Sequence, residues 1–122
     1  MTSPSFRLLA RVGGGVCLAL GAAWLLAPQG ILWSWRLDAG GAALPLSRRS
    51  AALFLGVGVT LLLARDAEPS KAREAIVVGF STMCAALAAL GVYEFVAGHA
   101  GPGILAAVVV EAALAAAFAR SA

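Results

Sequence analysis

The sequence predicts an all-α integral membrane protein, built as a bundle of four helices that cross the bilayer. Of its 122 residues, 61% are hydrophobic and 12% are charged, whereas soluble domains average about 25% charged residues. Four apolar stretches recur along the chain, and four helical spans of roughly 20 residues, the length that crosses a hydrocarbon core about 30 Å thick, would use nearly all of it. Alanine and leucine dominate these stretches. Both residues favour helix, and the alternating pattern of a membrane β-strand is missing.

The chain is expected to form one transmembrane domain, with spans at about residues 8–27, 47–64, 74–97 and 103–119. The first stretch follows Arg7 and Arg11, as in a signal peptide. It leads into Pro28 and tryptophan-rich sequence without a good cleavage site, so we expect a retained span. The second apolar run is short, and we expect its helix to begin near Ser47, capped by that serine after Pro45.

Three connections separate the spans. The first, residues 29–46, contains Trp33 and Trp35, which are typical interfacial anchors, so we expect a segment that lies along the membrane surface. The second, RDAEPSKARE, mixes both charge signs and should be solvated. The third, AGHAGPG, is expected to be a tight glycine-rich turn.

The distribution of basic residues predicts the orientation. Four spans in up-down-up-down order place six basic residues on the side of the termini, namely Arg7, Arg11, Arg65, Lys71, Arg73 and Arg120. The other side has three, namely Arg36, Arg48 and Arg49. Because cytoplasmic loops are enriched in Lys and Arg, we expect both termini in the cytoplasm, in a bacterial inner membrane. The net charge of +3 reflects this placement at segment ends, and no nucleic-acid partner is expected.

Small residues recur at four-residue spacing, which lets membrane helices pack closely. The rows are Gly15, Ala19 and Ala23, then Ala52, Gly56 and Thr60, then Ala85 and Ala89. They predict a tight bundle. Whether one row instead joins two copies in a homodimer stays open.

Glu111 is the one charged residue in AAVVVEAALAAAFA, the apolar core of the last span. A charge at the bilayer centre costs at least about 2.5–3.5 kcal/mol. The carboxyl group could be protonated and hydrogen-bonded to a hydroxyl of Ser81, Thr82 or Thr60 in neighbouring spans. Alternatively, it could face a water-filled cavity as a proton carrier or a ligand-binding group. Both interpretations are open.

Glu94 lies near the outer end of the third span, at the membrane face where Arg48 and Arg49 begin the second. An ion pair with one of these arginines, or a carboxylate that extends to the water interface, is expected there. Its role is either structural or that of a gate, with Tyr93 beside it, that opens toward Glu111.

Aromatic residues gather toward the outer face, namely Trp24, Trp33, Trp35 and Tyr93. They form either an interfacial belt or an aromatic box for a cationic or flat apolar ligand. His99, the one histidine, is expected to be a solvated residue of its turn.

No metal and no cofactor are expected, because the sequence has no CxxC pair and no histidine cluster. Cys17 and Cys84 lie in different spans and are expected to act as small apolar residues without a disulfide. A Ser–His–Asp set and closely spaced carboxylates are also missing from the sequence. A non-enzyme is therefore favoured over an enzyme.

Three sequence segments, LSRRSAALFLGVGVTLLLARD, KAREAIVVGFSTM and GILAAVVVEAALAAAFA, together resemble the DoxX-like group of small bacterial four-span membrane proteins. The resemblance covers roughly residues 45–120. It implies an accessory role, since some members are thought to be accessory subunits of membrane oxidoreductases. The positions that match are Arg49, Arg65, Arg73 and Glu111. Small multidrug resistance transporters have a similar length, but their glutamate lies in the first span.

Three functions are consistent with the sequence. The first is an accessory or structural subunit that binds a membrane-protein partner or lipid. The second is a proton-coupled small transporter or channel that uses Glu111 and works as a homodimer. The third is a binder of quinone, sterol or lipid. The lipid bilayer is the expected surrounding in every case.

Overall fold

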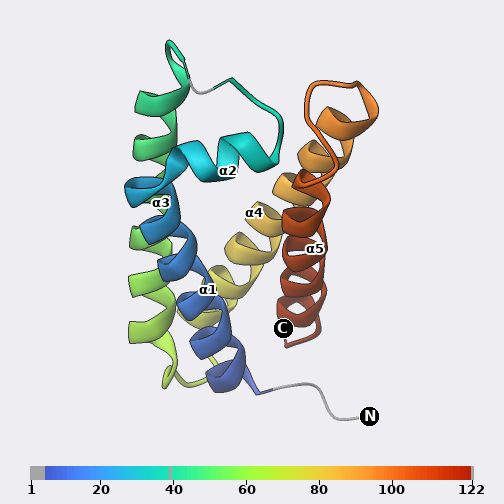
Figure 1. Ribbon diagram of the computed structural model, residues 1–122. Helices are drawn as coiled ribbons and strands as arrows, with labels where there is room; N and C mark the ends of the chain where they lie inside the picture. The colour runs from blue at the N-terminus through green and yellow to red at the C-terminus, as the bar shows by residue number, and fades with distance from the viewer. Residues whose placement is uncertain (1–4, 39, 122) are drawn as a thin grey trace.

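The computed structural model describes residues 5–38 and 40–121, and this part of the chain is entirely helical outside its connections (Figure 1). The helices are α1 (Phe6–Leu26), α2 (Pro28–Ser34), α3 (Ala43–Ala64), α4 (Lys71–Val96) and α5 (Ile104–Ser121). Helices α1, α3, α4 and α5 are long and apolar enough to cross a membrane. The predicted all-α fold with four candidate spans is confirmed, and it indicates a multi-pass membrane protein.

Serine caps explain where two of the long helices begin. The Ser5 hydroxyl accepts a hydrogen bond from the backbone N–H of Leu8 at 3.2 Å. The Ser70 hydroxyl accepts one from the N–H of Arg73, also at 3.2 Å. Such caps satisfy backbone donors that have no partner within the helix.

Helix α3 begins at Ala43, earlier than predicted. Ser47 does not cap it, because the serine is buried within the helix and its hydroxyl donates to the carbonyl oxygen of Ala43 at 2.7 Å. Pro45 lies in the first turn, where the missing N–H removes no intrahelical bond. Pro45 is therefore compatible with a helix that begins after it and with one that begins before it, so it did not determine the start.

The predicted surface segment contains a short helix, α2, which begins at Pro28. Leu32 is buried beneath it, whereas Trp33 is 81% exposed. In Figure 1, α2 runs across the long helices near the end where α1 finishes and α3 begins. The segment is thus an amphipathic cover and not an open loop.

The long helices pack as two pairs, α1 with α3 and α4 with α5, and the contacts between the pairs are fewer. Glycines bring α1 and α3 together. A Cβ atom added to Gly58 would lie 3.0 Å from the carbonyl oxygen of Gly14, and one added to Gly21 would lie 3.2 Å from that of Ala51. At these positions the two backbones approach so closely that an added side chain would push against the backbone of the neighbouring helix.

The predicted rows of small residues face away from this seam. A Cβ added to Gly15 or Gly56 would meet no atom within 4 Å. Other members of the rows are exposed, namely Ala19, Ala52, Thr60, Ala85 and Ala89. In an alanine-rich helix, four-residue spacing occurs on every face, so the pattern did not identify the face of each helix that packs within the bundle. The seam instead repeats after seven residues, from Gly14 to Gly21 and from Ala51 to Gly58.

The two pairs meet in a buried core at the end opposite α2. The core comprises Phe6, Leu9, Ala10, Cys17, Leu61, Val77, Phe80, Cys84 and Phe118. The rings of Phe80 and Phe118 pack edge to face with centroids 4.6 Å apart. Both cysteines are free thiols within this core.

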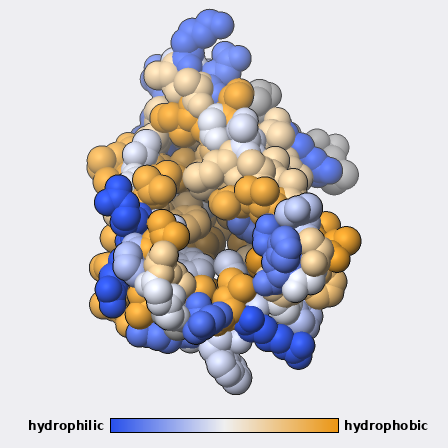
Figure 2. Space-filling view, turned by 90° about the horizontal axis from the view of Figure 1, so that it is seen from above, coloured by the Kyte–Doolittle hydropathy of each residue, from blue (hydrophilic) through white to orange (hydrophobic). Residues whose placement is uncertain are grey.

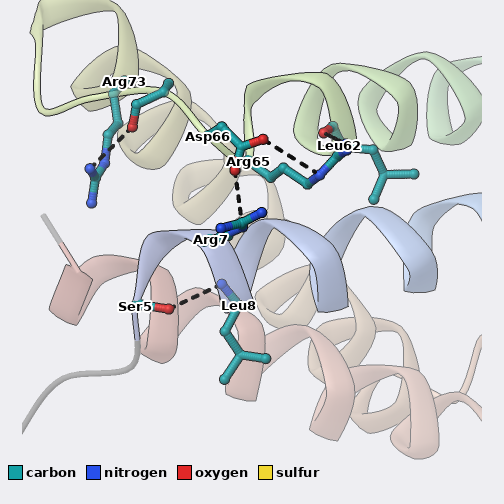
Figure 3. A network of polar contacts seen from close by, with 8 residues as sticks. Ser5, Arg7, Leu8, Leu62, Arg65, Asp66 and Arg73 are labelled. Carbon is teal, nitrogen blue, oxygen red and sulfur yellow. Dashed lines mark hydrogen bonds and ion pairs between the residues drawn. The ribbon is translucent and has the colours of Figure 1, made fainter.

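Polar contacts surround the same end (Figure 3). The Nε atom of Arg7 lies 2.9 Å from a carboxylate oxygen of Asp66, and that of Arg65 lies 3.9 Å from the other oxygen. The guanidinium of Arg73 sits 4.4 Å from the centre of the Phe6 ring. These contacts tie the start of α1 to the α3–α4 connection. Because the charges are well exposed, each pair stabilises the fold by at most about 1 kcal/mol.

Candidate functional site

A cavity of about 940 Å³ lies between the two helix pairs, at the end where α2 crosses them. Residues from all five helices line it. Figure 2, viewed from the end that is uppermost in Figure 1, shows the surface hollowed near its centre. The cavity exists because the pairs meet in the core at the opposite end and diverge toward α2. The α1–α3 and α4–α5 seams remain closed beside it.

The walls of the cavity are mostly apolar, with Leu20 from α1, Phe54 from α3 and Leu87 from α4. Trp24 and Trp35 line the cavity close to α2, where their rings pack edge to face with centroids 5.3 Å apart. The predicted aromatic group is therefore divided. Two tryptophans reach the cavity, while Trp33 and Tyr93 are 81% and 59% exposed.

Glu111 lines the same cavity from α5 and is half-buried. It follows Gly103, another lining residue, by eight positions, or about 12 Å of helix rise. The carboxyl group therefore lies deep, below the tryptophans, and it is the one charged side chain among the described lining residues.

The hydroxyl groups predicted to bond Glu111 have other surroundings. Thr82 donates to the carbonyl of Val78 at 2.8 Å, and Thr60 donates to that of Gly56 at 2.9 Å. The Ser81 oxygen is buried without a hydrogen-bond partner. The predicted polar clasp is therefore absent from the described residues, and Glu111 faces the cavity. The sequence showed the depth of these hydroxyls but not the rotation of their helices.

Three serines line the cavity closer to α2 than Glu111 does, namely Ser34, Ser47 and Ser50. Their hydroxyls donate to carbonyl oxygens of their own helices at 2.7, 2.7 and 2.9 Å. Each hydroxyl hydrogen is thus occupied, whereas the oxygen can still accept a hydrogen bond. The sequence did not indicate these serines as site residues: Ser47 was expected to be a helix cap, and nothing in the pattern shows that Ser34 at the end of α2 and Ser50 within α3 face one cavity.

Glu94 does not pair with Arg48 or Arg49. Its Oε2 atom lies 3.0 Å from Nδ1 of His99, and the histidine ring also packs edge to face with Tyr93 at 6.0 Å. Both arginines are exposed on α3, which belongs to the other helix pair. His99 is exposed as predicted, but it has a partner. None of these residues lines the cavity, so the structure gives no support to a gate at Glu94 that opens toward Glu111.

The α4–α5 turn holds α2 at the mouth of the cavity. The N–H of Gly101 donates to the carbonyl oxygen of Trp35 at 2.7 Å. A Cβ atom at Gly103 would collide with the carbonyl oxygen of Ser34. The glycines of AGHAGPG therefore allow a close approach of two backbones as well as a turn.

Replacing Gly103 with alanine should displace α2, because the added methyl group meets backbone and not a movable side chain. We expect the Trp24–Trp35 contact to break and tryptophan emission to shift to longer wavelength, measured in a Trp33→Phe background. The matched control is Gly30→Ala on α2, where an added Cβ meets nothing within 4 Å. Unchanged emission in the Gly103 variant would contradict the contact.

Comparisons with protein families, with curated proteins and with solved structures found no match to this chain. The cavity and its lining are therefore the basis on which a function is assigned.

Proposed function

We propose that the protein is a non-catalytic accessory membrane protein that binds an apolar small molecule in the cavity between its helix pairs. The observation that carries this proposal is the cavity itself, about 940 Å³ in volume and walled mostly by apolar side chains. Small-molecule sites are typically concave, apolar and roughly 300–1,000 Å³, with a few polar groups that orient the ligand. A quinone, a sterol or a lipid chain belongs to the class of molecule that such walls accept.

The lining supports binding over chemistry. Among the described residues, no histidine, lysine or cysteine reaches the cavity. The three serine hydroxyls donate to their own helices, so none is bonded to a base that could activate it. Nucleophilic catalysis needs such a base within hydrogen-bond reach. The resemblance of residues 45–120 to DoxX-like proteins also favours an accessory role.

We further propose that the spans run up-down-up-down in a bacterial inner membrane, with both termini in the cytoplasm. The Arg7–Asp66 ion pair supports this order, since it joins the start of α1 to the α3–α4 connection. The bond from Gly101 to Trp35 joins the other two connections. The cavity would then open toward the outer leaflet. A cysteine placed at Glu68 should react with an impermeant thiol reagent only after the membrane is permeabilised, and labelling of intact cells would contradict this orientation.

Filling the cavity should abolish ligand binding. Ala107 lines the cavity and is half-buried, so Ala107→Phe places a ring in the space that the ligand would occupy. We expect this variant to lose an apolar fluorescent probe that binds the native protein in lipid nanodiscs, together with any lipid-soluble molecule that mass spectrometry detects after purification.

The matched control is Ala112→Phe, an exposed position of α5 that does not line the cavity. This variant should bind the probe as the native protein does. Equal binding by both phenylalanine variants would show that the probe sits elsewhere, and the proposed function would fail.

A proton-coupled transporter is the second candidate, because the cavity gives access to Glu111 from one end of the molecule. The core around Phe80 and Phe118 closes the opposite end, so transport would require that core to open. Proton-driven uptake into vesicles that Glu111→Gln abolishes would favour this function over binding alone.

A further inference from the structure

We infer that the cavity selects a hydrophobic amine, a molecule whose protonated nitrogen lies against Glu111 while its apolar body fills the space above. This inference rests on the proposed ligand binding and names the chemical class of the ligand. It follows from three features of the lining, namely its charge, its hydrogen-bonding groups and the order of these groups with depth.

The one ionisable side chain among the described lining residues is acidic. It is Glu111, and no arginine, lysine or histidine of the described chain lines the cavity with it. Arg48 and Arg49 are exposed on α3 and do not reach it, and His99 pairs with Glu94 outside. A carboxylate in an apolar site is stable only when a cation or several donors face it. An anionic ligand would instead meet repulsion and would find no basic partner.

The hydrogen-bonding groups point to the same class. The hydroxyl groups of three lining serines donate to backbone carbonyl oxygens of their own helices, so towards a ligand they can only accept a hydrogen bond. These serines are Ser34, Ser47 and Ser50. An ionised Glu111 also only accepts. The indole N–H groups of Trp24 and Trp35 are donors, but they belong to the mouth. The polar oxygens of the cavity therefore favour a ligand whose head group donates.

The groups are ordered with depth. Glu111 lies about 12 Å below Gly103 along α5, and the residues of α5 that line the cavity between them are all apolar, namely Ala106, Ala107 and Val110. The tryptophan pair stands at the mouth, where aromatic rings also attract cations. An amphiphile oriented like a bilayer lipid, with its head group at the membrane surface, would place its tail against the carboxylate. A hydrophobic amine that enters with its nitrogen first pairs the charge and buries its hydrocarbon along the walls.

A matched series of twelve-carbon compounds tests this selection. Dodecylamine, dodecanol and dodecanoate would each displace an apolar fluorescent probe from the protein in neutral-lipid nanodiscs. Concentrations would be corrected for measured partitioning into protein-free nanodiscs. Charged hydrogen bonds are about twice as strong as neutral ones, so dodecylamine should displace the probe at a concentration about tenfold or more below that of dodecanol. Dodecanoate should be the weakest of the three.

Variants assign the selection to one residue. Glu111→Gln should reduce the advantage of dodecylamine over dodecanol to less than about twofold, whereas Glu111→Asp, which keeps the charge, should retain most of it. The control is Glu94→Gln, which removes a carboxylate outside the cavity and should leave the ranking unchanged. If Glu111→Gln does not fold, the ranking by the native protein and Glu111→Asp still decides the question.

The outcomes separate the two proposals. If all three compounds displace the probe equally and Ala107→Phe blocks them all, the cavity binds apolar molecules but selection for an amine is overturned. An amine preference that persists in Glu111→Gln overturns it as well. If no compound displaces the probe and Ala107→Phe behaves as the native protein, the proposed function itself fails.

Discussion

Replacing Phe118 with alanine should lower the free energy of unfolding by about 3–5 kcal/mol, as for other fully buried phenylalanines. Its side chain is completely buried and packs edge to face against Phe80. It also lies against α1, where a Cβ added to Gly13 would sit 3.1 Å from the Phe118 ring. This one residue thus joins α5 to α4 and to the other helix pair. Because packing holds membrane bundles together, the cavity left behind is destabilising in lipid as it is in water.

The measurement is unfolding in mixed micelles of increasing dodecyl sulfate fraction, followed by tryptophan emission. The matched control is Val109→Ala on the same helix, where the side chain is 68% exposed. Val109→Ala should change the free energy of unfolding by less than about 0.5 kcal/mol. Similar losses in the two variants would mean that the helix pairs are not joined through Phe118.

The Phe118 variant also bears on the transporter hypothesis. Phe118 belongs to the core that separates the cavity from the end where Arg7 contacts Asp66. A smaller side chain would shorten the closed region between Glu111 and that face. A proton leak across vesicles in Phe118→Ala, absent from the native protein, would show that this core is the barrier.

The four spans could be predicted because their signal is local. Apolar composition and length determine whether a segment can cross a membrane, and neither depends on its neighbours. The predicted start of α3 was wrong because proline is tolerated both before a helix and within its first turn. Pro45 therefore does not determine at which residue the helix begins. The surface segment was predicted, but the helix α2 within it was not, because seven residues carry little periodic signal.

Three residues of the candidate site could be named from the sequence, namely Glu111, Trp24 and Trp35, but the rest of the lining could not. Glu111 stood out because a carboxylate within an apolar span is costly wherever the span packs. Its partners depend on how each helix is rotated, which the alanine-rich faces of the other spans hardly constrain. The cavity arises from the divergence of two helix pairs, and no single segment encodes that arrangement.

Replacing Gly58 with leucine should separate α1 from α3 and lower the free energy of unfolding by about 3 kcal/mol or more, beyond the 1–3 kcal/mol typical of overpacking. A Cβ at this position already lies 3.0 Å from the Gly14 carbonyl oxygen and 2.9 Å from the Leu18 side chain. Leu18 could rotate away, but the carbonyl belongs to the backbone of α1. The remaining atoms of leucine therefore have no space unless the whole helix moves.

Gly56→Leu provides the comparison, since it lies two residues away on α3 and an added Cβ meets nothing within 4 Å. There the substitution should stabilise the helix slightly, because glycine is about 0.8–1 kcal/mol less favourable than good helix formers in a helix interior. The two variants should thus shift the unfolding midpoint in dodecyl sulfate in opposite directions. If the unfolding midpoint falls in both variants, Gly56 also lies in an interface. If the midpoint rises in both, α1 and α3 are not packed through Gly58. In the second case the α1–α3 wall of the cavity would lose its support, and binding at Glu111 would have to be explained by another arrangement of the spans.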